Sequence, residues 1–403
     1  MIRPARVRVV GSLALYAPGF RKELDRQGYK PGSAGEQLLL MAHVSRWLAS
    51  RDLNAGELTA VRVEQFLRAR RAEGYAHLRS ARALSPLLEH LRGLGVVPTP
   101  SPAVLATPIE AVLERYSVYL FEERGLSASS VRNYVDVARL FLSDREVTAG
   151  ALELEGLTTA AVSEFVLGEC RRCSVGSAKC MVTRLRSLLR FLHLEGLTER
   201  PLAAAVPSVA SWRLASLPKA IDARSVARLL KSCDRRTSVG RRDFAILTLL
   251  SRLGLRAGEV AAAELCDIDW RQGELVIRGK GNREERLPLP ADVGAAVVGW
   301  LRRGRPRCAC PYLFTRVRAP HSGLSSGGVS AVVRQACNRA GLPRVGAHRL
   351  RHTAATELLR AGGSLADVGQ VLRHRSPNST SIYAKVDRLA LASLVQPWPG
   401  AEQ

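Results

Sequence analysis

The chain has 403 residues, and its 60 lysines and arginines outnumber 36 acidic residues to give a formal charge of +24. This length is too great for one hydrophobic core but enough for two or three domains, and 46% hydrophobic residues exclude a disordered chain. Because such a charge repels itself and arginine binds phosphate through its planar fork, the composition indicates a polyanionic partner.

Membrane insertion and export are not indicated. No charge-free apolar run approaches the roughly 18 residues of a membrane span, and the short apolar segment at residues 9–20 lacks a small-residue cleavage site. The eight cysteines of so basic a chain are expected to be free thiols. Cys170, Cys173 and Cys180 could begin a zinc site, but no second pair follows at zinc-finger spacing. We therefore expect a cytoplasmic protein with no membrane partner and no metal or other cofactor.

The first half of the chain shows the hydrophobic period of helices. Helices are expected at residues 20–27, 35–48, 58–67 and 84–94. Two later segments repeat this pattern: LTTAAVSEFV at 157–166 echoes LTAVRVEQFL at 58–67, and LLRFLHLEG at 188–196 echoes LLEHLRGLG at 87–95. The echoes indicate two related helical units, although amphipathic helices often resemble one another.

The second half of the chain combines helices with a small hairpin. Residues 201–220 contain three prolines and no amphipathic face, so we interpret them as a linker. Residues 244–255 are apolar almost all round and predict a buried helix that ends at Gly254. Residues 274–278 and 285–289 read as strands around the turn GKGN. Further helices are expected at 291–302, 329–340, 348–361, 365–372 and 387–395. The predicted fold is mostly α with a small β-hairpin, an α+β catalytic half preceded by helical units.

An unusual set of polar residues lies near the end of the chain. His348, Arg351 and His352 stand at i, i+3 and i+4 and share one helix face. His374 follows the next expected helix, and Tyr383 comes nine residues later. Each residue alone is ordinarily a solvated, capping or packing group. Together they match a cluster of hydrogen-bond donors around a nucleophile.

These residues carry a family resemblance. HRLRH at 348–352 resembles the H-x-L-R-H box of the tyrosine recombinase/integrase family, and LRH at 372–374, followed by Thr380 and Tyr383, is similar to its L-G-H…T…Y box. Arg373 stands where the family usually has Gly. We expect this departure to affect the backbone beside His374 and not a catalytic group.

Three upstream motifs extend the resemblance over about residues 108–390. Arg256 and Glu259 resemble the family's R-x-x-E box, which begins with a catalytic Arg. The turn with Lys280 resembles its G-K-G-x-K-x-R hairpin, with Arg283 in place of the second Lys. Residues 127–134 resemble a helix start in the family's core-binding domain, where a basic face meets DNA phosphates; a solvated basic helix is the alternative.

The resemblance implies a catalytic set, which consists of Arg256, Lys280, His348, Arg351, His374 and Tyr383. In this chemistry the Tyr383 phenol attacks a phosphodiester, while two Arg forks and His374 hold the non-bridging oxygens. His348 takes or steers the phenol proton, and Lys280 protonates the leaving 5′-oxygen. Neither metal nor ATP is implied, because guanidinium groups supply the charge and the phosphotyrosyl bond stores the phosphodiester energy. The sequence also lacks a carboxylate cluster for two metals.

The implied function is site-specific DNA recombination through a covalent 3′-phosphotyrosyl intermediate. Two alternatives stay open: a type IB topoisomerase-like nicking-closing enzyme, and a catalytically silent DNA-binding protein. The implied partners are duplex DNA at a specific site, a homo-tetramer on that DNA and accessory recombinases, in the nucleoid and with a mobile element as source. The expected domains, clamped around the DNA, are an N-terminal helical unit at 1–105, a core-binding domain at 106–200, a linker at 201–220 and a catalytic domain at 221–403.

Overall fold

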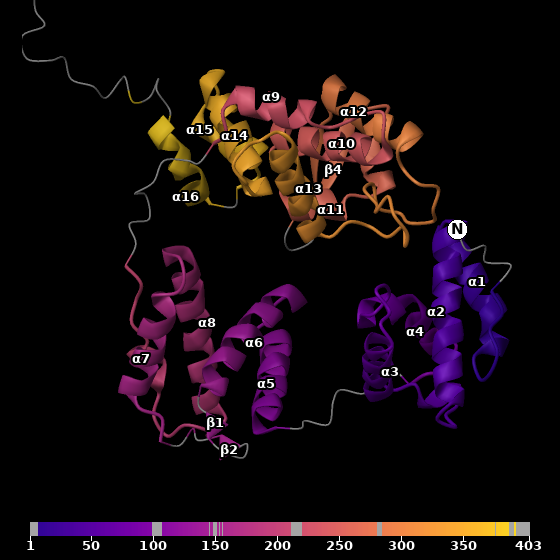
Figure 1. Cartoon of the computed structure of the whole chain (residues 1–403). Helices are drawn as coiled ribbons and strands as arrows, with labels where there is room; N and C mark the ends of the chain where they lie inside the picture. Colours follow the sequence, from indigo (N-terminus) through magenta and orange to yellow (C-terminus); the bar gives the residue numbers. More distant parts are fainter. Residues whose placement is uncertain are drawn as a thin grey trace, which may run out of the picture. The chain divides into compact units, whose positions relative to one another are not determined.

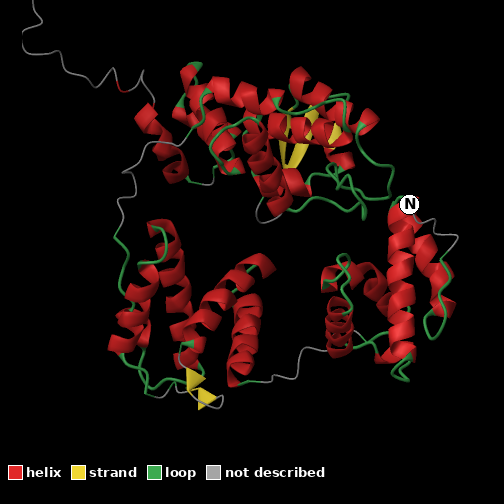
Figure 2. Ribbon diagram, in the orientation of Figure 1, coloured by secondary structure: helices red, strands yellow, loops and turns green. Residues whose placement is uncertain are grey.

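The computed structural model describes residues 7–98, 107–144, 146–147, 151–152, 154, 156–210, 220–279, 284–374, 376–386 and 391. Most of these residues lie in helices, and strands are few and short (Figures 1 and 2). This confirms the predicted fold class. The chain divides into two compact units: Met1–Pro98 with Ser216–Gln403, and Thr99–Ala215. No helix of the described part is long and apolar enough to cross a membrane.

The N-terminal helices surround a hydrophobic core of their own, drawn from residues between Leu13 and Val97. They are α1 (Ala17–Arg26), α2 (Pro31–Ala49), α3 (Ala60–Ala72) and α4 (Ala81–Gly93). The Thr59 hydroxyl accepts a hydrogen bond from the Arg62 amide and so caps α3. The four helices expected from the hydrophobic period are all present.

The second unit is a separate helical bundle with a core between Ile109 and Val206. Its elements are α5 (Pro108–Val118), a π-helix (Tyr119–Glu123), α6 (Ala128–Ser143), β1 (Glu146–Val147), β2 (Ala151–Leu152), α7 (Thr159–Cys170) and α8 (Val175–Leu194). The strands β1 and β2 pair antiparallel. The Ser127 hydroxyl caps α6 by accepting from the Ser130 amide, so the helix starts where the sequence motif predicts.

The C-terminal part is built around α10, which is buried as predicted and packs against α12, α13 and α14. Its helices are α9 (Ala223–Lys231), α10 (Ser238–Arg252), α11 (Ala257–Ala262), α12 (Ala291–Arg303), α13 (Ser326–Arg339), α14 (Ala347–Arg360), α15 (Leu365–Val371), α16 (Pro377–Thr380) and the 3-10 helix Ser381–Val386. Their core extends from Leu229 to Leu350. A smaller cluster joins α14, α15 and the 3-10 helix around Tyr383.

A three-stranded antiparallel sheet lies beside these helices, in the order β3 (Ile268–Asp269), β4 (Glu274–Arg278), β5 (Glu284–Pro288). Val276 pairs with Arg286, and Leu275 and Ile277 point into the core. The predicted hairpin is confirmed to within one residue, whereas β3 was not predicted. The turn that carries Lys280 lies outside the described residues, as does nearly all of the expected final helix at 387–395.

Candidate active site

The R-x-x-E motif forms the start of α11. Arg256 is the N-cap residue, and its backbone amide donates to Oε2 of Glu259 at 2.8 Å while its Nη1 donates to Oε1 at 2.6 Å. Burial works to raise the pKa of Glu259, but the Arg256 amide, the Arg373 charge and the Arg256 side chain together lower it below its usual value. Glu259 is therefore ionised and holds the Arg256 side chain by an ion pair. The Arg256 side chain stays 45% exposed, so part of its guanidinium faces solvent.

Arg351 lies inside the protein, only 1% exposed, on the first turns of α14. Its Nη1 donates to the Gly254 carbonyl at 2.7 Å, and its Nη2 donates to the Leu372 carbonyl. Burial lowers the pKa of Arg351 to about 10, and the nearby charge of Arg256 adds to this effect. Because one carbonyl precedes Arg256 and the other precedes His374, Arg351 ties α14 to both of the other site segments.

Tyr383 is buried beneath α14 and α15, with 1% exposure. Its hydroxyl is hydrogen-bonded to Nδ1 of His352 at 2.8 Å. Burial raises the pKa of Tyr383, and the charge of Arg351 opposes that rise. Burial, His348, Arg349 and Arg351 lower the pKa of His352 to about 4, so the imidazole is neutral at pH 7 and has a nitrogen lone pair.

His352, not His348, lies against the phenol. His348 was expected from the sequence to take or steer the phenol proton, whereas in the structure the His348 ring packs edge-on against His352 with centroids 4.5 Å apart. Burial, Arg351 and Arg256 lower the pKa of His348. His352 was recognised as part of the helix face but not selected as a site residue. The signal was its i+4 spacing from His348, which puts both rings on one face.

His374 follows α15 and is held by a hydrogen bond between its Nδ1 and the Thr380 hydroxyl, at 2.8 Å. Its ring stacks nearly parallel to the Tyr383 ring, with centroids 6.3 Å apart and an interplanar angle of 4°. Burial, followed by the charges of Arg351 and Arg256, lowers the pKa of His374 to about 4. Thr380 therefore orients the imidazole beside the phenol.

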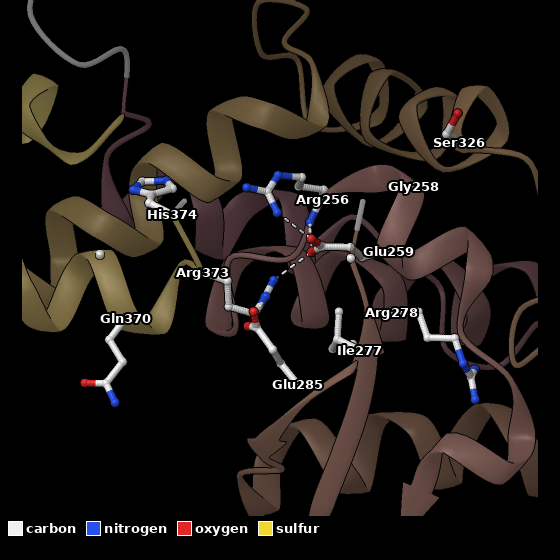
Figure 3. A pocket seen from close by; sticks show the side chains of 12 residues that line it. Arg256, Gly258, Glu259, Ile277, Arg278, Glu285, Ser326, Gln370, Arg373 and His374 are labelled. Carbon is white, nitrogen blue, oxygen red and sulfur yellow. Dashed lines mark hydrogen bonds and ion pairs between the residues drawn. The ribbon is translucent and has the colours of Figure 1, made fainter. Parts of the chain in front are cut away.

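Arg373 was expected to affect the backbone beside His374 and not a catalytic group, and its side chain also enters the site. Its Nη2 donates to Oε2 of Glu259 at 2.7 Å, and its side chain is only 5% exposed. Figure 3 shows Arg256 and Arg373 reaching the same carboxylate from two sides. The sequence did not predict this contact, because comparison with a glycine position gives no side chain to follow.

Some of these groups line a cavity of about 940 Å³ between the β4–β5 hairpin and the end of α15. Its charged and polar lining includes Arg256, Glu259, Arg278, Glu285, Arg373 and His374. Gly279, the residue before Lys280, also lines it. Five of the six residues selected from the sequence thus lie in one connected region, and the sixth, Lys280, is outside the described residues. Several guanidinium groups, neutral imidazoles and one phenol suit the binding and attack of a phosphate group.

Comparisons with known proteins agree with this chemistry. The model of the "Phage integrase family" matches residues 219–389. A putative integrase/recombinase, y4rA, of Sinorhizobium fredii (strain NBRC 101917 / NGR234) is 40% identical over 400 residues, 98% of this chain and 96% of the relative. Tyrosine recombinase XerC of Shewanella amazonensis (strain ATCC BAA-1098 / SB2B) is 32% identical over 285 residues, 70% of this chain and 93% of the relative. A structure of a lambda integrase tetramer bound to a Holliday junction has a TM-score of 0.52 at 19% identity, over 80% of this chain and 90% of that one.

Proposed function

The chain belongs to the phage integrase family of tyrosine recombinases, and from this premise we propose which of its residues perform the reaction. As a member it is a tyrosine-type site-specific recombinase, which cuts and rejoins DNA through a bond between a tyrosine and a phosphate. The observation that carries the residue assignment is the contact of a buried phenol with a neutral imidazole, beside a second imidazole and the charge of Arg351.

Tyr383 is the nucleophile in this proposal. A free phenol has a pKa near 10 and must lose its proton to attack phosphorus. Nδ1 of His352 is already within hydrogen-bonding distance, and a neutral imidazole can take that proton. His348, packed against His352, then orients the acceptor or passes the proton on. The reaction forms the Tyr383 Oη–phosphorus bond and breaks the bond from phosphorus to the 5′-oxygen.

Arg256, Arg351 and His374 stabilise the charge that develops on the non-bridging oxygens. The exposed part of Arg256 faces the cavity, so its guanidinium is available for a phosphate. Arg351 contributes its positive charge from a buried position. Two of its nitrogens donate to backbone carbonyls, and its charge lies beside both Arg256 and Tyr383. His374, fixed by Thr380, is the third donor.

Lys280 is the proposed general acid for the leaving 5′-hydroxyl, by family resemblance and by its place after Gly279 at the cavity edge. The buried position of Tyr383 corresponds to a resting arrangement, because a phenol with 1% exposure cannot meet a DNA phosphate. The Tyr383 hydroxyl must therefore become exposed when DNA binds.

The wider assignment rests on analogy with the family. We assign DNA binding to the helical domains at 1–105 and 106–200, joined by the linker at 201–220 to the catalytic domain at 221–403. The lambda integrase structure of similar fold holds a tetramer on a Holliday junction, which supports a homo-tetramer here as well. Duplex DNA as substrate favours action at the nucleoid, in the cytoplasm, with accessory recombinases as further partners. A mobile element is the proposed source.

Capture of covalent adducts on genomic DNA tests the function. Cells that express the protein are lysed in detergent, the protein-linked DNA is purified, and the ends are sequenced. A recombinase gives adducts at 3′ ends of a few related sequences, and Tyr383→Phe gives none. Adducts without sequence preference would contradict site specificity and favour a nicking-closing enzyme. Complete absence of adducts beside normal DNA binding would favour a silent binder.

A further inference from the structure

Arg373 occupies a backbone conformation that its own side chain disfavours. Its φ is +55°, in the left-handed region where the Cβ of an L-residue approaches the following carbonyl. Glycine adopts this conformation without that penalty. Strain of this kind persists only where the surrounding contacts over-determine it, and it concentrates at functional sites. Backbone hydrogen bonds from the Arg373 amide to the Gln370 carbonyl and from the His374 amide to the Gly369 carbonyl, both 2.9 Å, hold this turn, and the Arg373 side chain adds further contacts.

The side chain makes those contacts with two acidic residues from different elements. Nη2 of Arg373 lies 2.7 Å from Oε2 of Glu259 at the start of α11, and its Nε lies 3.6 Å from Oε2 of Glu285 on β5. A guanidinium that is 5% exposed needs such partners, because an unpaired buried charge is strongly unfavourable. The turn before His374 is thus connected to the β-hairpin by an ion pair.

Arg373 also fixes the carboxylate that holds Arg256. Oε1 of Glu259 accepts from Nη1 of Arg256, while Oε2 accepts from the Arg256 amide and from Arg373 (Figure 3). With both oxygens occupied from different directions, the carboxylate cannot rotate, and Arg256 keeps one orientation toward the cavity. Glu259 has one negative charge and pairs with two guanidinium groups. It therefore neutralises less of the positive charge of Arg256, and more of that charge is available to a phosphate.

We propose that Arg373 is a positioning residue for DNA cleavage, which sets Arg256 through Glu259 and joins the turn of His374 to strand β5. This inference rests on the role proposed for Arg256. Without Arg373, Glu259 is free to turn and pairs fully with Arg256, while the hairpin loses its connection to the turn. DNA affinity should change little, because a side chain that is 5% exposed makes no direct contact with the DNA.

The test compares Arg373→Gly with a matched control, Asp52→Gly. Asp52 has the same φ of +55° in a turn after α2, so both substitutions relieve the backbone and only one removes the ion pairs. We expect both variants to retain the thermal transition of the parent protein and to bind DNA equally well. Arg373→Gly should cleave a suicide DNA substrate about 10- to 100-fold more slowly in single-turnover assays, the range for a displaced catalytic group. Arg373→Lys should cleave at an intermediate rate. Glu285→Gln should lose less of the cleavage rate, because the contact between Arg373 and Glu285 is longer than that between Arg373 and Glu259.

A double-mutant cycle with Arg256→Ala separates positioning from a general structural role. If Arg373 acts through Arg256, Arg373→Gly should cause no further loss of cleavage in the Arg256→Ala background. Two outcomes would overturn the role proposed for Arg373 and leave the role of Arg256 standing. One is additive losses of cleavage in the double variant, and the other is normal cleavage by Arg373→Gly when Arg256→Ala is defective. Loss of DNA affinity or of folding that accounts for the whole decrease in Arg373→Gly would also overturn it. Normal cleavage by Arg256→Ala would refute the proposed role of Arg256 itself and, with it, this inference.

Discussion

Gly254 lies between the buried helix α10 and Arg256 at the start of α11. Replacing Gly254 with alanine should lower both the stability of the protein and the rate of DNA cleavage. Its φ is +59°, so it adopts the left-handed conformation that follows the end of the helix. A Cβ at this position would lie 2.6 Å from Cδ2 of Leu372 and 3.3 Å from Cβ of Ala354. Leu372 is fully buried, and the Ala354 methyl has no rotamer that would move it away.

The expected cost follows from these contacts. The left-handed backbone contributes about 1–2 kcal/mol, and the overpacked contacts contribute about 1–3 kcal/mol. The lower entropy of the unfolded alanine chain offsets about 0.4–1 kcal/mol of this. We therefore expect Gly254→Ala to reduce the free energy of unfolding by about 3 kcal/mol. Cleavage should also fall, because the Gly254 carbonyl accepts from Arg351 and the segment continues into Arg256.

The assay is calorimetric unfolding of the full chain, combined with single-turnover cleavage. Gly299→Ala is the control, because Gly299 lies within α12 and a Cβ there meets nothing within 4 Å. It should stabilise the protein by about 0.5–1 kcal/mol, the helix preference of alanine over glycine, and leave cleavage unchanged. Equal stability of Gly254→Ala and the parent protein would refute the packing argument at this turn.

Three further predictions concern the leaving group, the pH and the salt concentration. Lys280→Ala should cleave ordinary DNA on the order of 10² to 10⁴ slower and recover on DNA with sulfur at the bridging 5′ position, whereas equal slowing on both substrates would exclude Lys280 as the acid. The pKa values of His352 and His374 are about 4 in the folded protein against an ordinary 6.5, so the unfolded chain binds more protons between these values. Thermal stability should then fall as the pH drops from 6.5 towards 4, and it should fall less in His374→Asn. The same dependence of stability on pH in that variant and in the parent protein would contradict the lowered pKa of His374. DNA affinity should fall with salt, with a log–log slope of about −0.9 per phosphate contact, and an affinity independent of salt would contradict a phosphate-led interface.

Much of the fold follows from local signals in the sequence. The 3.6-residue period located the helices, and Ser127 caps α6 at the start that its motif predicts. The GKGN turn between two strand-like runs located the hairpin. Strand β3 was missed because a strand of two residues shows no alternation that can be read. Its place is decided by pairing with β4, which is a tertiary contact.

The sequence selected residues that the structure brings together, but it did not predict their contacts. The ordered motifs selected Arg256, Arg351, His374 and Tyr383, because each motif fixes residue types at short spacing. Which imidazole meets the phenol depends on how the segment after α15 folds back beneath α14, and no local pattern encodes that approach. The sequence therefore could not separate His348 from His352.

Arg373 illustrates a second limit. An effect on the backbone was expected from the glycine that the family usually has at this position, and the φ of Arg373 is positive. The side chain, however, reaches Glu259, which lies 114 residues earlier in the chain. Comparison with a family explains what a chain shares with its relatives, and physical contacts in the structure are needed where the chain departs from them.

The central claim is that Tyr383 forms the covalent bond to DNA, and peptide mapping of the adduct tests it most directly. The protein is trapped on a suicide substrate and digested with nuclease and trypsin, and the nucleotide-modified peptide is fragmented in a mass spectrometer. The tryptic peptide SPNSTSIYAK contains Tyr383 as its one tyrosine. We predict the nucleotide on Tyr383 and no adduct in Tyr383→Phe, which should still bind DNA. A nucleotide on another residue, or an adduct that survives in Tyr383→Phe, would contradict the account.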